Sequence, residues 1–366
     1  MFGLSQLTEV REIDGVDTFV SGGFGTVPAI VWVAFQLTFA VITVALISGA
    51  VAERMKFGTW LLFGGIWVTL VYFPLSHMVW GGGGLLSGSE DGIAAKIFGV
   101  DEEGAANVSP IDFAGGTVVH INAGMAALVL AILLGKRNGF GKIAFRPHNV
   151  PFVLLGSAIL WFGWFGFNVG SEGAADMLAG AVWVNTTAAT AAAMLAWLLV
   201  ERIRDGHATS VGAASGIVAG LVAITPACGS LSAIGSLILG AIAGVLSALA
   251  IGLKYKLGYD DSLDVVGVHL VAGLWGHHRH RVPRNRDRPV LRWWGGPAAR
   301  RADRHRFGGS GLHRHHDRHH RVHRQAPWAG ECPRRKRTLV SMKLNMPKRL
   351  TSSPDRRQFH RKGSTT

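Results

Sequence analysis

Cysteine is nearly absent from this 366-residue chain, which has Cys228 and Cys332 alone. Two cysteines cannot form the network of bridges that stabilises disulfide-rich domains, so no such fold is predicted. The N-terminal sequence MFGLSQLTEVREIDGVDTF also lacks a basic start followed by an apolar run. We therefore expect no signal peptide, and insertion into a membrane must use apolar segments further along the chain.

Acidic residues become scarce beyond Gly276. Up to that residue the chain has 12 lysines and arginines against 18 aspartates and glutamates, whereas the remainder has 25 against 5 and holds 11 of the 16 histidines. The net charge of +14 is therefore the sum of an acidic segment and a strongly basic one. We divide the chain into residues 1–27, a loop or remnant of a truncated N-terminus, an apolar domain over 28–276, and an Arg/His-rich tail over 277–366.

The long apolar segments of the second part lack the polar faces, at 3.6-residue spacing, that a soluble helical bundle requires. Each is close to the about 20 apolar residues that cross a bilayer as a helix, and the charges cluster between them. Abundant glycine and alanine suit helices that pack closely within lipid. We predict an all-α, polytopic membrane helical bundle whose spans run roughly over 28–51, 58–80, 112–135, 150–170, 178–201, 211–227 and 231–254, with an eighth that begins near Ser262 and is interrupted at Gly276.

Two histidines lie inside predicted spans, where an ionisable side chain is costly and usually functional. His120 lies in VHINAG and His269 lies in VHLVAG, so their contexts nearly repeat. Transporters built from internal repeats place their sites where equivalent segments meet. We expect the two imidazoles to face each other, although a hydrogen-bonded packing role is the alternative for either one.

Aromatic side chains cluster near span ends in FQLTFA, SHMVWGGG and FGWFGFNVGS. Ring faces attract a cation without a fixed counter-charge, by roughly 0.5 to 2 kcal/mol per contact, which suits brief binding before conduction. For a single ring, anchoring at the membrane interface is the alternative. The histidines have no Cys or carboxylate at metal-ligand spacing, and the sequence has no nucleophile elbow. We therefore predict no metal site, no cofactor and no enzyme.

Seven motifs in order over about residues 20–276 closely resemble the ammonium transporter (Amt) family: FQLTFAVITVALISGAVAERMKF, HMVWGGGG, DFAGGTVVHINAG, GKRNGFGKIAFRPHNVP, WFGWFGFNVGS, TPACG and DVVGVHLVAG. The resemblance implies a homotrimer in the cell membrane, with one pore per subunit. It also implies a fold of eleven spans, here about seven to eight recognisable, with an inverted repeat around the pore. The implied function is ammonium or ammonia transport.

The resemblance also implies roles for single residues. Phe39, Trp80 and Ser171 are similar to the residues that bind ammonium, and Phe39 and Phe167 to the phenylalanine gate. His120 and His269 resemble the family's twin-histidine pair in the pore. Asp112 matches an aspartate needed for ammonium recognition and local structure, and a helix N-cap is compatible with that role.

The chain departs from the family at both ends. Two further spans precede FQLTFA in family members, so we expect a truncated start. After GLWG the sequence HHRHRVPRNRDRP cannot continue a membrane helix, and the codons for His277 and His278 permit Thr or Ile in a shifted frame. We therefore expect a frameshift, a disordered segment over 277–366, and an inactive polypeptide if the chain is expressed as written.

Three alternatives remain open at this stage. In the first, the basic tail is a genuine arm that binds nucleic acid or anionic lipid. The tail has no recognisable nucleic-acid module, so no nucleic acid is expected as a partner. An ammonium sensor of the same fold and an unrelated solute channel are the others. Membrane lipid and a P-II regulatory protein are the further partners considered, and the motifs do not decide whether P-II binds.

Overall fold

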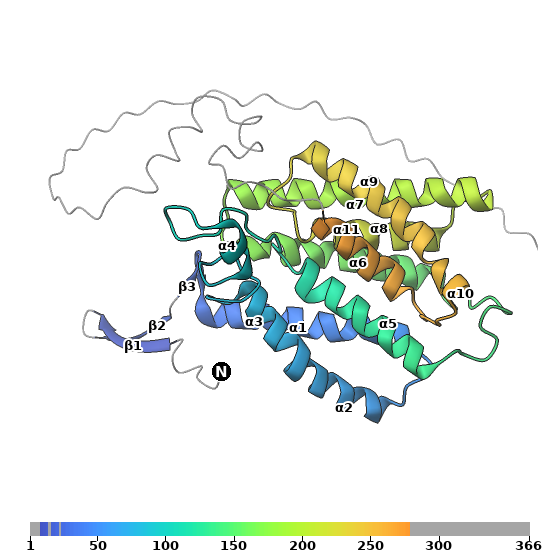
Figure 1. The fold of residues 1–366 in the computed structure, drawn as a ribbon, viewed down its shortest axis with the longest axis horizontal. Coiled ribbons are helices and arrows are strands. Elements are labelled where there is room, and N and C mark those ends of the chain that lie inside the picture. The colour runs from blue at the N-terminus through green and yellow to red at the C-terminus, as the bar shows by residue number, and fades with distance from the viewer. Residues whose placement is uncertain (1–7, 14–15, 22, 279–366) are drawn as a thin grey trace, which may run out of the picture. The chain divides into compact units, whose positions relative to one another are not determined.

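The structure is a computed structural model that describes residues 8–13, 16–21 and 23–278 (Figure 1). The chain divides into two units, Met1–Phe307 and Gly308–Thr366, and every described residue belongs to the first. The segment 277–366 that the sequence sets apart therefore lies outside the described residues, except for His277 and His278. These two end the last helix, which continues two residues beyond the predicted interruption at Gly276.

Six helical stretches among the described residues are long and apolar enough to cross a membrane, and each overlaps a predicted span. The predicted all-α polytopic bundle is therefore confirmed. The helices that build these six stretches are α1 (Ala29–Val51), α2 (Phe57–Trp67) with η2 (Val68–Tyr72) and α3 (Phe73–Trp80), η3 (Gly116–Ile121) with α5 (Asn122–Leu134), α6 (Val150–Asn168) with η4 (Gly170–Glu172), α7 (Met177–Asp205), and α9 (Ala233–Ala250) with α10 (Leu253–Leu257).

Three further helices complete the described bundle. They are α4 (Ile93–Phe98), α8 (Ser210–Ile224), and η5 (Val266–Leu270) with α11 (Val271–His278). The predicted span over 211–227 corresponds to α8, whose 15 residues extend about 22 Å, less than the roughly 30 Å of a hydrocarbon core. Pro226 explains the early end, because a proline has no backbone N–H to donate to the carbonyl oxygen four residues before it, that of Val222.

Close packing of small residues joins α7, α8 and α9. A methyl group at Gly240 would lie 2.1 Å from the Ala189 carbonyl oxygen, and one at Gly244 would lie 2.3 Å from the Ala193 carbonyl oxygen. Because no side chain fits at these two positions of α9, its backbone contacts α7 directly. The predicted use of glycine for close helix packing is confirmed here.

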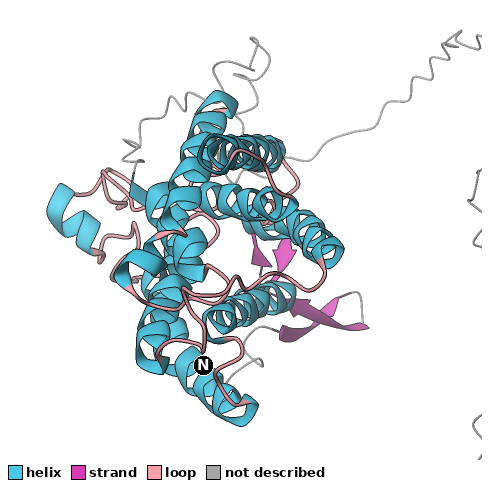
Figure 2. Ribbon diagram, turned by 90° about the vertical axis from the view of Figure 1, so that its right-hand side faces the viewer, coloured by secondary structure: helices cyan, strands magenta, loops and turns pink. Residues whose placement is uncertain are grey.

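The N-terminal residues form strands, whereas the sequence analysis treated residues 1–27 as a loop. β1 (Thr8–Ile13) pairs antiparallel with β2 (Val16–Ser21), and β3 (Gly23–Phe24) pairs with β4 (Val27–Pro28). The sequence Asp14–Gly15 between β1 and β2 is typical of two-residue hairpin turns. Figure 2 shows that these strands are a minor part of a helical structure.

Candidate functional site

Two histidines from distant parts of the chain lie against each other inside the bundle. His120 belongs to η3 and His269 to η5, the wide π-helical turns that lead into α5 and α11. Their Nδ1 atoms are 3.3 Å apart, and their ring centroids are 5.4 Å apart. Only 0% and 7% of the two residues is exposed. The predicted meeting of the imidazoles is confirmed as geometry, while their role stays a prediction.

The glycine that ends each of the motifs VHINAG and VHLVAG explains how the two segments approach so closely. A methyl group at Gly124 would lie 2.6 Å from Leu270 Cβ, and one at Gly273 would lie 3.2 Å from Ile121 Cγ1. Leu270 and Ile121 are the residues that directly follow the two histidines. Each glycine therefore makes room for the histidine turn of the opposite motif, and the contact is reciprocal.

Asp112 fixes the start of the helix that carries His120. Its carboxylate accepts hydrogen bonds from four successive backbone amides, those of Gly115 at 3.0 Å, Gly116, Thr117 at 2.9 Å and Val118 at 3.1 Å. Its carbonyl oxygen accepts a hydrogen bond from Trp80 Nε1 at 2.8 Å. The N-cap residue of η3 is Gly115 rather than Asp112, but the Asp112 carboxylate, three residues earlier, accepts the hydrogen bonds that an N-cap side chain would accept.

Aromatic rings form a stack next to the histidine pair. Phe39 and Phe167 lie face to face, with centroids 4.2 Å apart and planes at 25°. Trp80 meets Phe39 edge-on at 5.6 Å, and Phe167 lies 6.3 Å from the ring of His120. Three predicted site residues from α1, α3 and α6 therefore come together, and Phe167 connects them to the histidines.

Ser171 lies one helical turn beyond Phe167, in η4, and is half-buried. Its hydroxyl donates a hydrogen bond to the Phe167 carbonyl oxygen at 2.7 Å. The hydrogen of the hydroxyl is therefore engaged, and the lone pairs of the oxygen remain able to accept. In the part of the chain that the structure describes, no hydrogen bond or ring contact joins Ser171 to Phe39 or Trp80.

Two aromatic residues at the site were missed by the sequence analysis. Trp164 stacks on His120 at 5.4 Å with planes at 10° and also contacts Phe167 at 5.2 Å. Phe35 meets Phe39 edge-on at 4.9 Å. Helical spacing offered a signal for both, because residues three or four apart share a face: Phe35 precedes Phe39 by four residues, and Trp164 precedes Phe167 by three.

A buried polar network holds Trp164. Its indole Nε1 donates to Thr225 Oγ1 at 2.8 Å, and the Thr225 hydroxyl contacts Asn168 Oδ1 at 3.3 Å. Asn168 in turn donates to Thr186 Oγ1 at 3.1 Å. Because buried polar groups are costly unless they are paired, this network fixes the plane of the indole against His120.

The paired imidazoles leave hydrogen-bonding capacity in an apolar surrounding. A neutral imidazole has one donor and one acceptor nitrogen, so the contact between the two Nδ1 atoms requires one hydrogen between them. His120 Nε2 has no hydrogen-bond partner among the described residues. This nitrogen therefore remains able to donate or accept a further hydrogen bond. The described residues contain no group of three or more His, Cys, Asp or Glu able to hold a metal ion.

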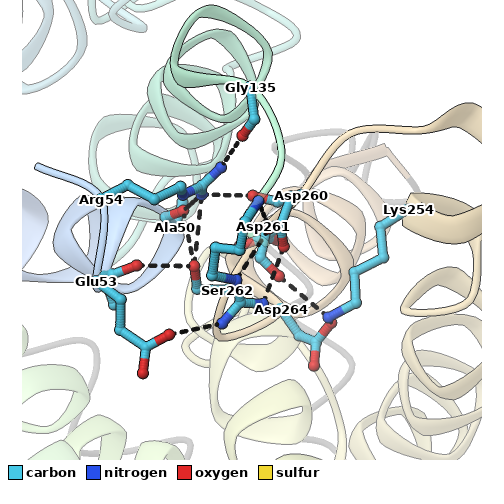
Figure 3. A network of polar contacts seen from close by, with 11 residues as sticks. Ala50, Glu53, Arg54, Gly135, Lys254, Asp260, Asp261, Ser262 and Asp264 are labelled. Carbon is cyan, nitrogen blue, oxygen red and sulfur yellow. Dashed lines mark hydrogen bonds and ion pairs between the residues drawn. The ribbon is translucent and has the colours of Figure 1, made fainter. Parts of the chain in front are cut away.

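A network of charged residues lies beyond the C-terminal end of α1, away from the aromatic rings (Figure 3). The Arg54 guanidinium donates to the carbonyl oxygens of Ala50, Gly135 and Asp260. Arg137 forms a bidentate pair with the Asp260 carboxylate, with two nitrogen–oxygen distances of 2.9 Å. These two arginines tie the ends of α1 and α5 to the segment before η5.

The charges in this network shift one another's pKa. Burial acts to raise the pKa of Asp260, but hydrogen bonds from the Arg137 side chain and backbone, with the charges of Arg137 and Arg54, lower it below its ordinary value. The hydrogen bond to Asp260 raises the pKa of Arg137. Both groups therefore remain charged at neutral pH, and the pair acts as an ionic clamp.

Comparison with known proteins adds an independent finding. The sequence profile of the Ammonium Transporter Family matches residues 4–282. An ammonium transporter of Mycobacterium tuberculosis H37Rv is 65% identical over 252 residues, which cover 69% of this chain and 50% of the relative. An ammonium transporter of Aquifex aeolicus is 51% identical over 250 residues, which cover 68% and 54%.

Solved structures agree with the sequence matches. The crystal structure of Candida albicans Mep2 has a TM-score of 0.60 and 38% identity to this chain, covering 69% of it and 52% of the Mep2 chain. This chain spans about half the length of the curated relatives that it matches.

Proposed function

Because this chain belongs to the ammonium transporter family and is a multi-pass membrane protein, we propose that its histidine pair lines a pore for ammonium nitrogen. The observation that carries the proposal is the contact of His120 and His269, 3.3 Å apart and buried behind stacked aromatic rings. A conducting pore needs hydrogen-bonding groups that contact a solute without holding it tightly. Two neutral imidazoles in an apolar surrounding supply such groups.

Ammonium first binds at the aromatic residues. The rings of Phe39 and Trp80 attract the cation, by roughly 0.5 to 2 kcal/mol per contact, and the Ser171 oxygen accepts a hydrogen bond from it. The carboxylate of Asp112 is saturated by backbone amides, so its role is to hold this end of the pore rather than to bind the ion. Weak binding without a fixed counter-charge allows the solute to move on.

Neutral ammonia then passes the histidines. A charge inside a membrane span is costly, so transfer of the ammonium proton to solvent water at the aromatic end, before the apolar passage, lowers the barrier. Ammonia accepts or donates hydrogen bonds as it meets each imidazole. Phe39 and Phe167 act as the gate, because their rings at 4.2 Å leave no space for a solute between them and one ring must move for passage.

The family resemblance implies a homotrimer, a P-II regulatory protein is a further partner to test, and the proposal includes transport without an enzymatic step. Large apolar side chains remain exposed on α1, α2 and η2, among them Leu37, Leu62 and Leu70 at 60%, 66% and 69%. Such a surface suits membrane lipid or a second copy of the chain. Native mass spectrometry of the detergent-solubilised chain, alone and with a P-II protein, tests both partners.

Uptake of radiolabelled methylammonium by cells without their own ammonium transporters tests the function. From a gene with the reading frame corrected after Gly276 we expect uptake that ammonium competes away, and its loss in His120→Ala and His269→Ala, whereas His148→Ala, at an exposed histidine, leaves it unchanged. The gene as written is measured in parallel and is expected to give no uptake, so that an effect of the tail is separated from the site. Absence of competable uptake from the corrected gene, with protein present in the membrane, contradicts transport. Ammonium binding without uptake indicates a sensor instead.

A further inference from the structure

The segments that lead into the two histidine turns share a spacing. Asp112 lies eight residues before His120, and Asp261 lies eight residues before His269. The first segment starts beside Trp80, at the aromatic end, and the second starts beside the charged network at the other end of α1. The two aspartates are therefore equivalent positions of an inverted repeat, and they lie at opposite ends of the histidine pair.

The backbone repeats along with the spacing. Three residues after each aspartate the chain is left-handed, at Gly115 with φ 111° and at Asp264 with φ 61°. The carbonyl oxygens of these two residues then accept hydrogen bonds from the amides of Val119 and Val268, each at 2.9 Å. Val119 and Val268 directly precede the histidines, so the same turn geometry sets where each imidazole begins.

Asp261 uses its carboxylate as Asp112 does, but less completely. Its Oδ2 accepts a hydrogen bond from the Val266 amide at 2.7 Å, at the start of η5. The residue is 1% exposed, and its Oδ1 accepts no hydrogen bond among the described residues. Asp112, in contrast, has donors at both oxygens. The carboxylate of Asp261 thus has fewer amide donors at this turn than the four that Asp112 has at the other.

We propose that Asp261 is the positioning residue of His269, the counterpart of Asp112 for His120, and that it holds the η5 turn at the distance where the two imidazoles meet. The proposal rests on the proposed role of the histidine pair for its functional meaning. Its structural content, that the carboxylate of Asp261 determines the place of His269, stands independently of transport.

An ion pair supports the Asp261 anchor. It is formed by Asp264, which occupies the position that Gly115 has in the other half of the repeat. Left-handed backbone disfavours a residue with a side chain, so Asp264 needs a compensating interaction. Lys254 Nζ supplies it, at 2.6 Å from Asp264 Oδ1, and also donates to the Asp261 carbonyl oxygen at 3.1 Å (Figure 3). Lys254 therefore ties both aspartates to α10.

Asp261 is mainly charged at neutral pH, although its surroundings raise its pKa. Burial raises its pKa to about 6, and the charge of Asp264 acts in the same direction, while the Val266 amide and Lys254 lower it. Arg54 is a further charge that interacts with Asp261. A charged acceptor makes a stronger hydrogen bond than a neutral one. The isosteric Asp261→Asn variant therefore keeps an acceptor but weakens it, and Asp261→Ala removes it.

Hydrogen–deuterium exchange of the 366-residue chain in lipid nanodiscs tests the anchor. We expect amides 265–270 to exchange at least tenfold faster in Asp261→Ala and by an intermediate factor in Asp261→Asn. Amides 115–121 and those of α7 keep their rates. Asp112→Asn is the mirror control, with faster exchange at 115–121. In protein labelled with 15N-histidine, the nitrogen resonances of His269 shift in Asp261→Ala more than in Asp261→Asn.

Unchanged exchange at 265–270 together with unchanged His269 resonances in Asp261→Ala overturns the inference. If Asp261→Ala also exchanges faster in α7, the whole fold is loosened, and the milder variant Lys254→Met decides instead. Unchanged exchange at 265–270 and unchanged His269 resonances in Lys254→Met then overturn the inference. Methylammonium uptake is measured on the same variants. Absent uptake from the unsubstituted frame-corrected gene alongside the expected exchange pattern contradicts the proposed function and leaves the positioning role standing.

Discussion

At the Phe39 end of the histidine pair there are many rings and few charges, whereas at the Arg54 end the charges dominate. Asp112 at the first end gives both carboxylate oxygens to backbone amides. Arg54 and Arg137 at the second end bind carbonyl and carboxylate oxygens of three segments. The contrast separates two tasks. The aromatic end presents ring faces beside a carboxylate that backbone amides already occupy, and the charged end fastens the helices.

Asp112→Ala gives the largest expected effect, because it breaks the aromatic end at its anchor. Four backbone amides lose a charged acceptor in a buried place, and such hydrogen bonds contribute about 1.5 to 3 kcal/mol each. We expect a loss of at least about 3 kcal/mol in the free energy of unfolding, measured by denaturant titration in detergent. Asp176→Ala, which removes the ordinary N-cap of α7, is the control and costs about 1 kcal/mol. Equal losses would contradict the special role of Asp112.

Arg137→Met is the corresponding break at the charged end. It leaves the buried Asp260 carboxylate without its bidentate partner, and we expect a loss of about 3 kcal/mol at neutral pH. The effect depends on pH. Because the pKa of Asp260 is lowered in the fold, the stabilisation is complete above its ordinary pKa of 3.8 and is lost as the pH falls through the folded value. The gap between the two proteins therefore narrows below about pH 4.

Denaturant titrations at pH 7 and at successively lower pH check this prediction. The exposed pair of Arg204 and Asp205, with side chains 42% and 40% exposed, provides the control. Arg204→Met leaves the free energy of unfolding nearly unchanged, since solvent screens the pair. A gap for Arg137→Met that stays constant from pH 7 to pH 3 would show that the carboxylate of Asp260 is not what the arginine stabilises.

Gly124→Ala tests the contact that lies between the aromatic end and the charged end, where the two histidine motifs meet. The new methyl group would lie 2.6 Å from Leu270 Cβ, whereas at Gly273 its nearest neighbour would lie at 3.2 Å. We expect Gly124→Ala to destabilise by about 2 kcal/mol and to reduce methylammonium uptake more than Gly273→Ala does. Gly163→Ala, in a helix position with open space around it, leaves both measurements nearly unchanged. The reverse order for the two motif glycines would contradict the close approach of Gly124 to Leu270.

Thr225→Val has the smallest expected effect and tests the support of the aromatic end. The substitution keeps the size of the side chain and removes the oxygen that accepts from Trp164 Nε1. A loss of about 1 kcal/mol follows for the hydrogen bond, with a reduced uptake because the indole no longer has a fixed plane against His120. Thr187→Val, at a half-buried hydroxyl bonded within its own helix, is the matched control and should have no effect on uptake.

Much of the fold followed from the sequence, because apolar length and the charges between spans are physical requirements of a bilayer. The same reasoning overestimated α8, since hydropathy does not register that Pro226 ends the helix. It missed the β1–β2 hairpin, because the N-terminal residues were assigned to a loop by resemblance. Alternating polar and apolar residues around Asp14–Gly15 carried the signal for that hairpin.

The candidate site was predictable where a motif repeats and less so elsewhere. The shared context of His120 and His269 correctly indicated that the two imidazoles meet. Trp164 was overlooked, because its relation to His120 depends on the crossing of two helices and on a hydrogen bond to Thr225. The contacts of the charged network were not predictable either. Arg54, Arg137 and Asp260 are far apart in sequence, and each lies in a polar loop between predicted spans.

The reciprocal contact of the two motif glycines means that neither half of the repeat can be altered alone. Extra bulk on α5 pushes the turn that carries His269, and extra bulk on α11 pushes the turn that carries His120. A displacement of one histidine motif is therefore expected to displace the other. Compensating changes should arise in pairs across the contact, so a selection for restored uptake in Gly124→Ala is expected to recover second substitutions at or next to Leu270.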